Sequence, residues 1–116
     1  MPRIFLFDPA AGSTIIGPIS ILDGQSLQAL LVSWPSTVDA LQLNYTIERN
    51  GEIQTGRLLI ANDGTDVSCT DDNTDTETAL GIIFDARLNG GNLELVYIST
   101  ATGFPAAFRY SEERFN

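Results

Sequence analysis

Histidine and lysine are both absent from this 116-residue sequence, and their absence excludes most enzyme chemistry. Without histidine there is no Ser-His-Asp or Cys-His arrangement, and the commonest general base and metal ligand are missing. Without lysine, Schiff-base and Ser-Lys mechanisms are excluded. The glycines form neither of the phosphate-binding patterns G-x-x-x-x-G-K-[ST] and G-x-G-x-x-G. Two carboxylates could serve a glycosidase, but among 15 acidic residues such a pair arises by chance. We therefore expect no enzymatic activity and no cofactor.

Cysteine and long apolar runs are also scarce. The single cysteine, Cys69, rules out an internal disulfide. No apolar stretch approaches the roughly 20 residues of a membrane-spanning helix. Residues 1–3 lead into a short apolar run that Asp8 and Pro9 end, which is not the pattern of a signal peptide. We expect the protein to be made and kept, or assembled, in a cytoplasm.

The charge of the chain is strongly negative, with 15 acidic residues against 6 basic ones and a net charge of −9. Such a surface repels phosphate backbones and anionic lipids, so we expect neither a nucleic-acid nor a membrane partner. Every basic residue is an arginine, which is enriched in protein interfaces because its planar guanidinium pairs well with carboxylates. A compositional bias against lysine is the alternative explanation.

The strongest structural signal is a β-hairpin around Asn50-Gly51. Residues 41–47 alternate between apolar and polar side chains, and a second apolar-rich run follows at 53–61. Asn-Gly favours a type I′ turn, because both central positions of that turn need a positive φ. The sequence therefore predicts two antiparallel strands joined by this turn.

Further strands are predicted from the same alternation. The length of 116 residues suits a single domain over 1–116, which would need no metal or disulfide to hold its core. Residues 25–32 also contain good helix formers, so a helix is the alternative there. Short alternating runs that are separated by turn-forming residues predict an all-β, antiparallel β-sandwich of about seven or eight strands, jelly-roll-like or immunoglobulin-like. Residues 1–10 would form an N-terminal arm or an edge strand. The additional predicted strands are 4–7, 19–22, 27–33, 80–86, 93–98 and 104–110.

The acidic stretch 63–77 is the most distinctive local feature. Its composition favours a solvated loop of turn-forming residues. Carboxylate oxygens are also calcium ligands, although the spacing does not match a calcium-binding loop. Pairing with arginines of a neighbouring subunit is a third interpretation. The candidate calcium ligands are Asp63, Asp66, Asp71, Asp72 and Asp75.

Two single residues have open interpretations. We expect Cys69 to be buried, because a free cysteine behaves as a small apolar side chain. Trp34 could stack on a sugar or anchor an interface, and it could equally cap one end of the core.

The sequence resembles a recurring module of tailed-bacteriophage virion proteins, found as head decoration proteins and within tail or neck appendages. The resemblance covers residues 38–114 and consists of scattered tyrosine, arginine, glycine and aromatic positions. It implies a β-sandwich that assembles into a virion without enzymatic activity, and it identifies no functional residues. The segments that carry it are 45–51, 55–60, 63–64, 81–84, 91–97, 102–103, 107–110 and Arg114.

We therefore expect a capsid decoration or cement protein that is assembled in the host cytoplasm and binds the major capsid protein on the outer surface of the head. A homodimer or homotrimer is expected, because bridging subunits across a symmetry axis favours an isologous contact. Phe5 and Phe7 could instead complete an edge strand of the core. The expected contact residues are Arg3, Phe5, Phe7, Trp34, Arg109 and Phe115.

Two other functions remain open at this point. One is a tail, neck or baseplate component, which would be present in far fewer copies per particle. The other is a carbohydrate-binding module for host recognition that uses Trp34 or Tyr110. The second requires exposed aromatic side chains, so burial of Trp34 and all three tyrosines would exclude it.

Overall fold

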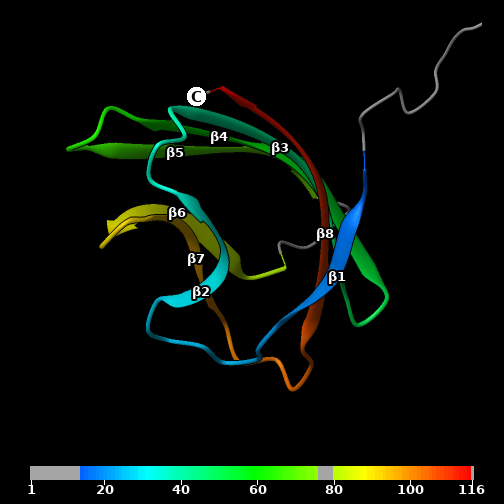
Figure 1. The fold of residues 1–116 in the computed structure, drawn as a ribbon. Helices are drawn as coiled ribbons and strands as arrows, with labels where there is room; N and C mark the ends of the chain where they lie inside the picture. Colours follow the sequence, from blue (N-terminus) through cyan, green and yellow to red (C-terminus); the bar gives the residue numbers. More distant parts are fainter. Residues whose placement is uncertain (1–13, 76–79, 116) are drawn as a thin grey trace, which may run out of the picture.

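The alternation of apolar and polar residues folds into eight β-strands, in a computed structural model that describes residues 14–75 and 80–115 (Figure 1). That part of the chain contains no helix, and therefore none that could span a membrane. The all-β prediction is confirmed, whereas the predicted arm and strand within residues 1–10 lie outside the described residues. The strands are β1 (Ile16–Ile21), β2 (Ala29–Pro35), β3 (Ala40–Arg49), β4 (Glu52–Asn62), β5 (Val67–Asp75), β6 (Ile82–Asn89), β7 (Asn92–Ser99) and β8 (Ala106–Phe115).

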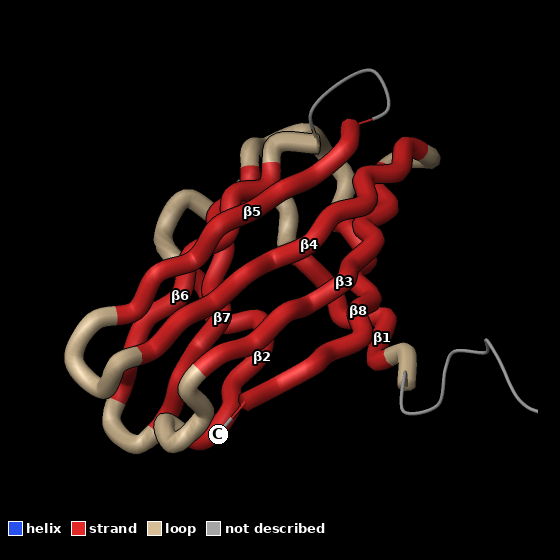
Figure 2. Tube along the Cα trace, turned by 90° about the horizontal axis from the view of Figure 1, so that it is seen from above, coloured by secondary structure: helices blue, strands red, loops and turns tan. Residues whose placement is uncertain are grey.

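The strands form two antiparallel sheets that face each other. A five-stranded sheet, the large sheet, has the order β1-β8-β3-β4-β5, and a three-stranded sheet, the small sheet, has the order β2-β7-β6. Strand β8 returns to lie beside β3, the first strand of the β3–β4–β5 meander, which is a Greek key. The pairs β1–β8 and β2–β7 are nested as in a rolled ribbon, which favours the jelly-roll-like description. Figure 1 shows the large sheet arching over the small one, and Figure 2 shows its strands side by side.

The predicted hairpin is confirmed. Asn50 and Gly51 have φ angles of 52° and 82°, as a type I′ turn requires. Strands β3 and β4 pair without interruption from Arg49 opposite Glu52 to Ala40 opposite Ala61. The hairpin therefore sets the register at the centre of the large sheet.

The structure decides two sequence-based predictions at the level of single elements. The segment around 27–33 is strand β2 rather than a helix, so the strand prediction is confirmed. The acidic stretch is not a loop throughout, because residues 67–75 form β5, which pairs with β4 from Gln54 to Asn62. Val67 and Cys69 pack against the core from this strand, and the edge position lets its other face stay in water.

The core lies between the sheets and is centred on aromatic rings. The ring centroids of Tyr45, Phe84, Phe108 and Tyr110 lie 5.4–5.7 Å apart in successive contacts that join both sheets. Such pairs add to the stability that burial of the rings provides. Strand β7 is the most completely buried strand because it is the centre of the small sheet.

Arg49, at the end of β3, binds three connections at one end of the sandwich. Its Nε donates to the carbonyl of Phe104 at 3.0 Å and its Nη1 donates to that of Leu80 at 2.7 Å. Its Nη2 donates to the carbonyl of Thr100 and to Asp23 Oδ1, both at 2.6 Å. The side chain is 3% exposed, so its charge depends on these partners.

A second polar network lies under β4 and β5. The Tyr45 hydroxyl donates to Asp71 Oδ1 at 2.6 Å and accepts a hydrogen bond from Gln54 Nε2 at 3.0 Å. Gly56 leaves room for the Tyr45 hydroxyl, because a Cβ at residue 56 would lie 2.7 Å from that hydroxyl and 2.8 Å from the Asp72 carbonyl.

Replacing Gly56 by alanine should therefore destabilise the fold by about 2 kcal/mol, the usual size of an overpacking effect. Gly91→Ala is the matched control, because no atom lies within 4 Å of a Cβ built at Gly91. Urea unfolding of both variants measures the difference. Equal unfolding midpoints for the two variants would contradict the packing described here.

The pKa of Asp23 provides a second prediction for stability. This pKa is lowered from 3.8, chiefly because the Thr102 N–H donates a hydrogen bond to the carboxylate. Partial desolvation would raise the pKa, but further hydrogen bonds from Gly103 and Arg49 outweigh that effect. A carboxylate with a lowered folded-state pKa stabilises the fold above its unfolded pKa, and this contribution is lost as the pH falls through the folded value. Asp23→Asn should therefore lower the urea midpoint at about pH 6, and the difference from the wild type should shrink as the pH falls towards about 2. A difference that stays constant over this range would contradict the assignment.

Candidate functional site

Polar side chains dominate the outer face of the large sheet. Along β3, Leu41, Leu43, Tyr45 and Ile47 point into the core, and the residues that alternate with them point outward. The same alternation holds along β4 and β8. The outer side chains of the three central strands are mostly polar, and several are short.

Strand register brings these side chains into rows across the sheet. One row places Ser111, Asn44, Arg57 and Asp72 side by side on β8, β3, β4 and β5. The next row places Arg109, Thr46 and Thr55 side by side on β8, β3 and β4. We call the surface formed by these seven residues the polar face.

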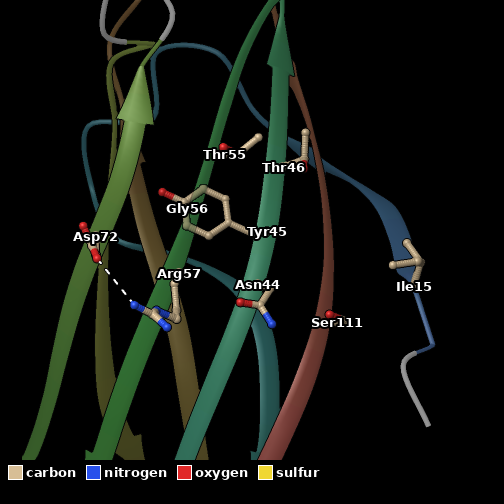
Figure 3. Close-up of a pocket in the computed structure, with 9 residues that line it drawn as sticks. All are labelled: Ile15, Asn44, Tyr45, Thr46, Thr55, Gly56, Arg57, Asp72 and Ser111. Atoms are coloured by element: carbon tan, nitrogen blue, oxygen red, sulfur yellow. Dashed lines mark ion pairs between the residues drawn. The ribbon is translucent and has the colours of Figure 1, made fainter. Parts of the chain in front are cut away.

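A shallow depression of about 510 Å³ lies in the polar face (Figure 3). Short side chains form its middle, with Ile15 on the β1 side and Arg57 and Asp72 on the β5 side. The longer side chains at the two sides rise above the short ones in the middle, which leaves the surface concave. The lining residues are Ile15, Asn44, Tyr45, Thr46, Thr55, Gly56, Arg57, Asp72 and Ser111.

The chemistry of the depression is that of hydrogen bonding. Arg57 and Asp72 approach to 3.7 Å, and their side chains are 49% and 71% exposed, so the pair is screened by water and contributes little stability. Hydroxyl and amide groups can both donate and accept hydrogen bonds. The serine and threonine hydroxyls of the depression have no histidine to activate them, because the chain contains no histidine. The depression therefore suits recognition of a polar surface.

The predicted contact residues divide into three groups. Arg109 is exposed on the polar face, against Gly17, and Phe115 is exposed near its edge. Trp34 is only 4% exposed, so its prediction as a contact residue is wrong. Arg3, Phe5 and Phe7 lie outside the described residues.

Trp34 instead caps one end of the core. Its Nε1 donates to Glu112 Oε1 at 3.0 Å, and Arg114 holds the other oxygen of that carboxylate at 2.7 Å. Tyr45, Tyr97 and Tyr110 are also buried. No aromatic platform for a sugar therefore exists at these four residues, and the carbohydrate-binding interpretation based on them is wrong.

The five candidate calcium ligands do not converge in the described part of the chain. Asp63 accepts the N–H groups of Thr65 and Asp66, which forms a turn. Asp71 points inward to Tyr45 and Asp72 points outward to Arg57, because neighbouring strand residues face opposite sides. The Asp75 side chain is not among those described. Within residues 14–75 and 80–115, no group of three acidic or cysteine side chains could hold a metal ion.

Sequence reasoning missed a second outer surface, on the small sheet. Leu30 lies opposite Val96, and Ile83 lies opposite Ile98, with all four side chains directed to the outer side, where Val96 is fully covered and Ile98 is half-buried. Leu30 is 52% exposed and Ile83 is 63% exposed. We call these four residues the apolar face. The available signal was the run from 95 to 98, in which both alternating positions carry apolar or aromatic residues.

Comparisons of this chain with protein-family models, with curated proteins and with solved structures give no significant match. The resemblance to bacteriophage virion modules therefore rests on the sequence segments given above. The function has to be argued from the two outer faces.

Cys69 has a lowered reactivity in this structure. It is half-buried on β5, and burial raises its pKa to about 11, with the negative charges of Asp85 and Asp71 adding to the effect. Because the thiolate is the reactive form, native protein at about pH 8 should react with a thiol reagent at least tenfold more slowly than urea-unfolded protein. Rates followed by absorbance test this. Equal rates in the two states would contradict the environment described for Cys69.

Proposed function

We propose that this protein is a structural component of a bacteriophage virion, a capsid decoration protein that binds the major capsid protein through its polar face. The observation that carries the proposal is the polar face itself, a broad surface for recognition without a catalytic group. The resemblance of residues 38–114 to virion modules supports the same role. The protein would lie on the outside of the head and stabilise contacts between capsid subunits.

The size of the polar face supports a stable contact. The outer side of the large sheet, of which the polar face is the central part, has five strands about 4.8 Å apart and about 20 to 36 Å long, and it covers roughly 700 Å². A specific interface of standard size buries about 800 Å² on each partner. One sheet face is therefore sufficient for one contact with a capsid subunit, and repetition over the lattice multiplies its effect.

The side chains of the polar face also suit docking. Short serine, threonine and asparagine side chains lose little conformational entropy when a partner covers them. The charges on the outer side of the large sheet nearly balance, with Arg57 and Arg109 against Glu48, Asp72 and Glu113, whereas the whole chain carries −9. This part of the surface therefore carries little of the negative charge of the chain.

The edges of both sheets oppose the alternative mode of contact, in which a partner adds a strand. Pro18 and a register irregularity interrupt β1, and a second irregularity together with Pro35 interrupts β2. Strand β5 carries Asp71 and Asp72, and on β6 the Asp85 carboxylate accepts the N–H of Ala86 at 2.8 Å. Charges, prolines and bulges at edges prevent strand pairing between molecules. Contacts with a partner are therefore expected on the outer faces of the two sheets rather than at their edges.

The experiment that tests the function is quantification of this polypeptide against the major capsid protein in purified particles by mass spectrometry. Hundreds of copies per particle would support decoration of the head. Tens of copies or fewer would favour the tail, neck or baseplate alternative and overturn the decoration proposal. Absence from the particle would overturn any virion role.

A substitution in the polar face tests the docking surface. Thr55 is exposed at the centre of this face, and Thr55→Glu adds a bulky charge to the depression. We expect at least a tenfold loss of binding to particles that lack the protein, because an unpaired charge would be buried in the contact. Thr37→Glu is the matched control, since Thr37 is exposed in the β2–β3 turn.

Binding is measured by co-sedimentation of each variant with the particles, after circular dichroism has shown that both variants are folded. Unchanged binding of Thr55→Glu would overturn the polar face as the docking surface. An equal loss for Thr37→Glu would overturn it too, because the effect would then not be specific to this face.

A further inference from the structure

The apolar face of the small sheet is unlike the polar face and has no role in the contact proposed above. Its exposed side chains are Leu30 and Ile83 on the two edge strands and the half-buried Ile98 on β7, which lie over the fully buried Val96. Exposed apolar side chains that gather on one surface mark an interaction site more often than scattered ones do. A partner that covers this face must therefore bring apolar side chains.

Charged residues continue the outer surface of β6 beyond Ile83. Asp85 is exposed and accepts hydrogen bonds from Gln28 Nε2 at 3.4 Å and from the Ala86 N–H at 2.8 Å, and it makes no ion pair with another described residue. Two residues further, Arg87 is already held by Glu94 at 2.7 Å. The chemistry of this face thus calls for apolar groups next to one cation.

We propose that the apolar face binds residues 3–7 of a second copy of this chain. In an extended segment alternate residues face the same side, so Arg3, Phe5 and Phe7 would share one side. The separation of Arg3 from Phe5 is two residues, the same as that of Asp85 from Ile83 on β6. Phe5 and Phe7 would then cover the apolar face while Arg3 pairs with Asp85.

The reach of the chain favours a second copy over the same copy. The described chain begins at Thr14, next to β1, and β1 then runs about 20 Å to the loop that leads into the small sheet (Figure 1). The seven residues from Phe7 to Thr14 span at most about 24 Å. A path back along β1 would take up nearly all of this length. Phe7 of the same copy would then not reach around β2 to the outer side of the small sheet.

Exchange of the segment between two copies closes a symmetric dimer. Each copy would donate residues 3–7 and receive them, so both apolar faces are covered and no open chain of molecules forms. This inference does not rest on the virion role, because it concerns the free protein in solution.

The first test is sedimentation velocity of the full chain without any particle present. We expect a concentration-dependent dimer that becomes monomeric when residues 1–8 are removed. Ile83→Lys should weaken the dimer at least tenfold, because it places a cation where Phe5 would be buried next to Arg3. Ile53→Lys is the matched control, since Ile53 is 45% exposed on the outer side of the large sheet. It should leave the dimer unchanged.

A charge exchange tests the pairing of Arg3 with Asp85. Arg3→Glu and Asp85→Arg should each weaken the dimer a few-fold, as an exposed ion pair does, and the double variant should restore it. Circular dichroism of every variant shows that the fold is retained. A structural effect of Asp85→Arg alone would not be reversed by Arg3→Glu.

Three results would overturn the proposal: a wild-type monomer at all concentrations, a dimer that survives removal of residues 1–8, or a dimer that is insensitive to Ile83→Lys. Failure here and failure of the virion role are distinguishable. A monomer that still binds particles through the polar face refutes only the dimer. A dimer absent from particles refutes only the decoration role.

Discussion

The buried guanidinium of Arg49 is the interaction on which the rest of the structure depends. It stands at the end of β3, where its hydrogen bonds hold the carbonyls of Leu80, Thr100 and Phe104 and the carboxylate of Asp23. These partners lie on three connections between the two sheets. Removing the guanidinium would leave the buried carbonyl of Leu80 and the carboxylate of Asp23 without this partner, a loss of about 3 kcal/mol. The relative position of the sheets, and with it the shape of both outer faces, follows from this one side chain.

Two outer faces of different chemistry result from a single core. The large sheet buries one apolar side of each strand and leaves mostly polar residues outside, as an antiparallel sheet facing water does. In the small sheet, β7 also carries the apolar residues Val96 and Ile98 on its outer side, with Val96 fully covered and Ile98 half-buried. The protein therefore has one surface suited to a polar partner and one suited to an apolar segment. Its edges oppose strand pairing, which leaves these faces as the surfaces available for assembly.

The sequence predicted the fold class and most strands, because side-chain alternation and turn chemistry are local properties. The Asn50-Gly51 turn and the strand at Ala29–Pro35 are examples. The acidic strand β5 was predicted as a loop, since aspartate and threonine are common in turns and nothing local reports the free edge of β4. The contact residues were predicted less well. Trp34 is buried and donates a hydrogen bond to Glu112, a partner 78 residues away, which the sequence around the tryptophan does not indicate.

By itself the sequence determined which side chains alternate, where the central hairpin turns, and that histidine- and lysine-dependent chemistry is impossible. Only the tertiary structure decided which outward side chains stand together. Ser111, Asn44, Arg57 and Asp72 share a row because β8 returns beside β3 in one particular register. That register depends on packing between strands far apart in the chain, and a shift of one residue would turn the opposite side of β8 outward.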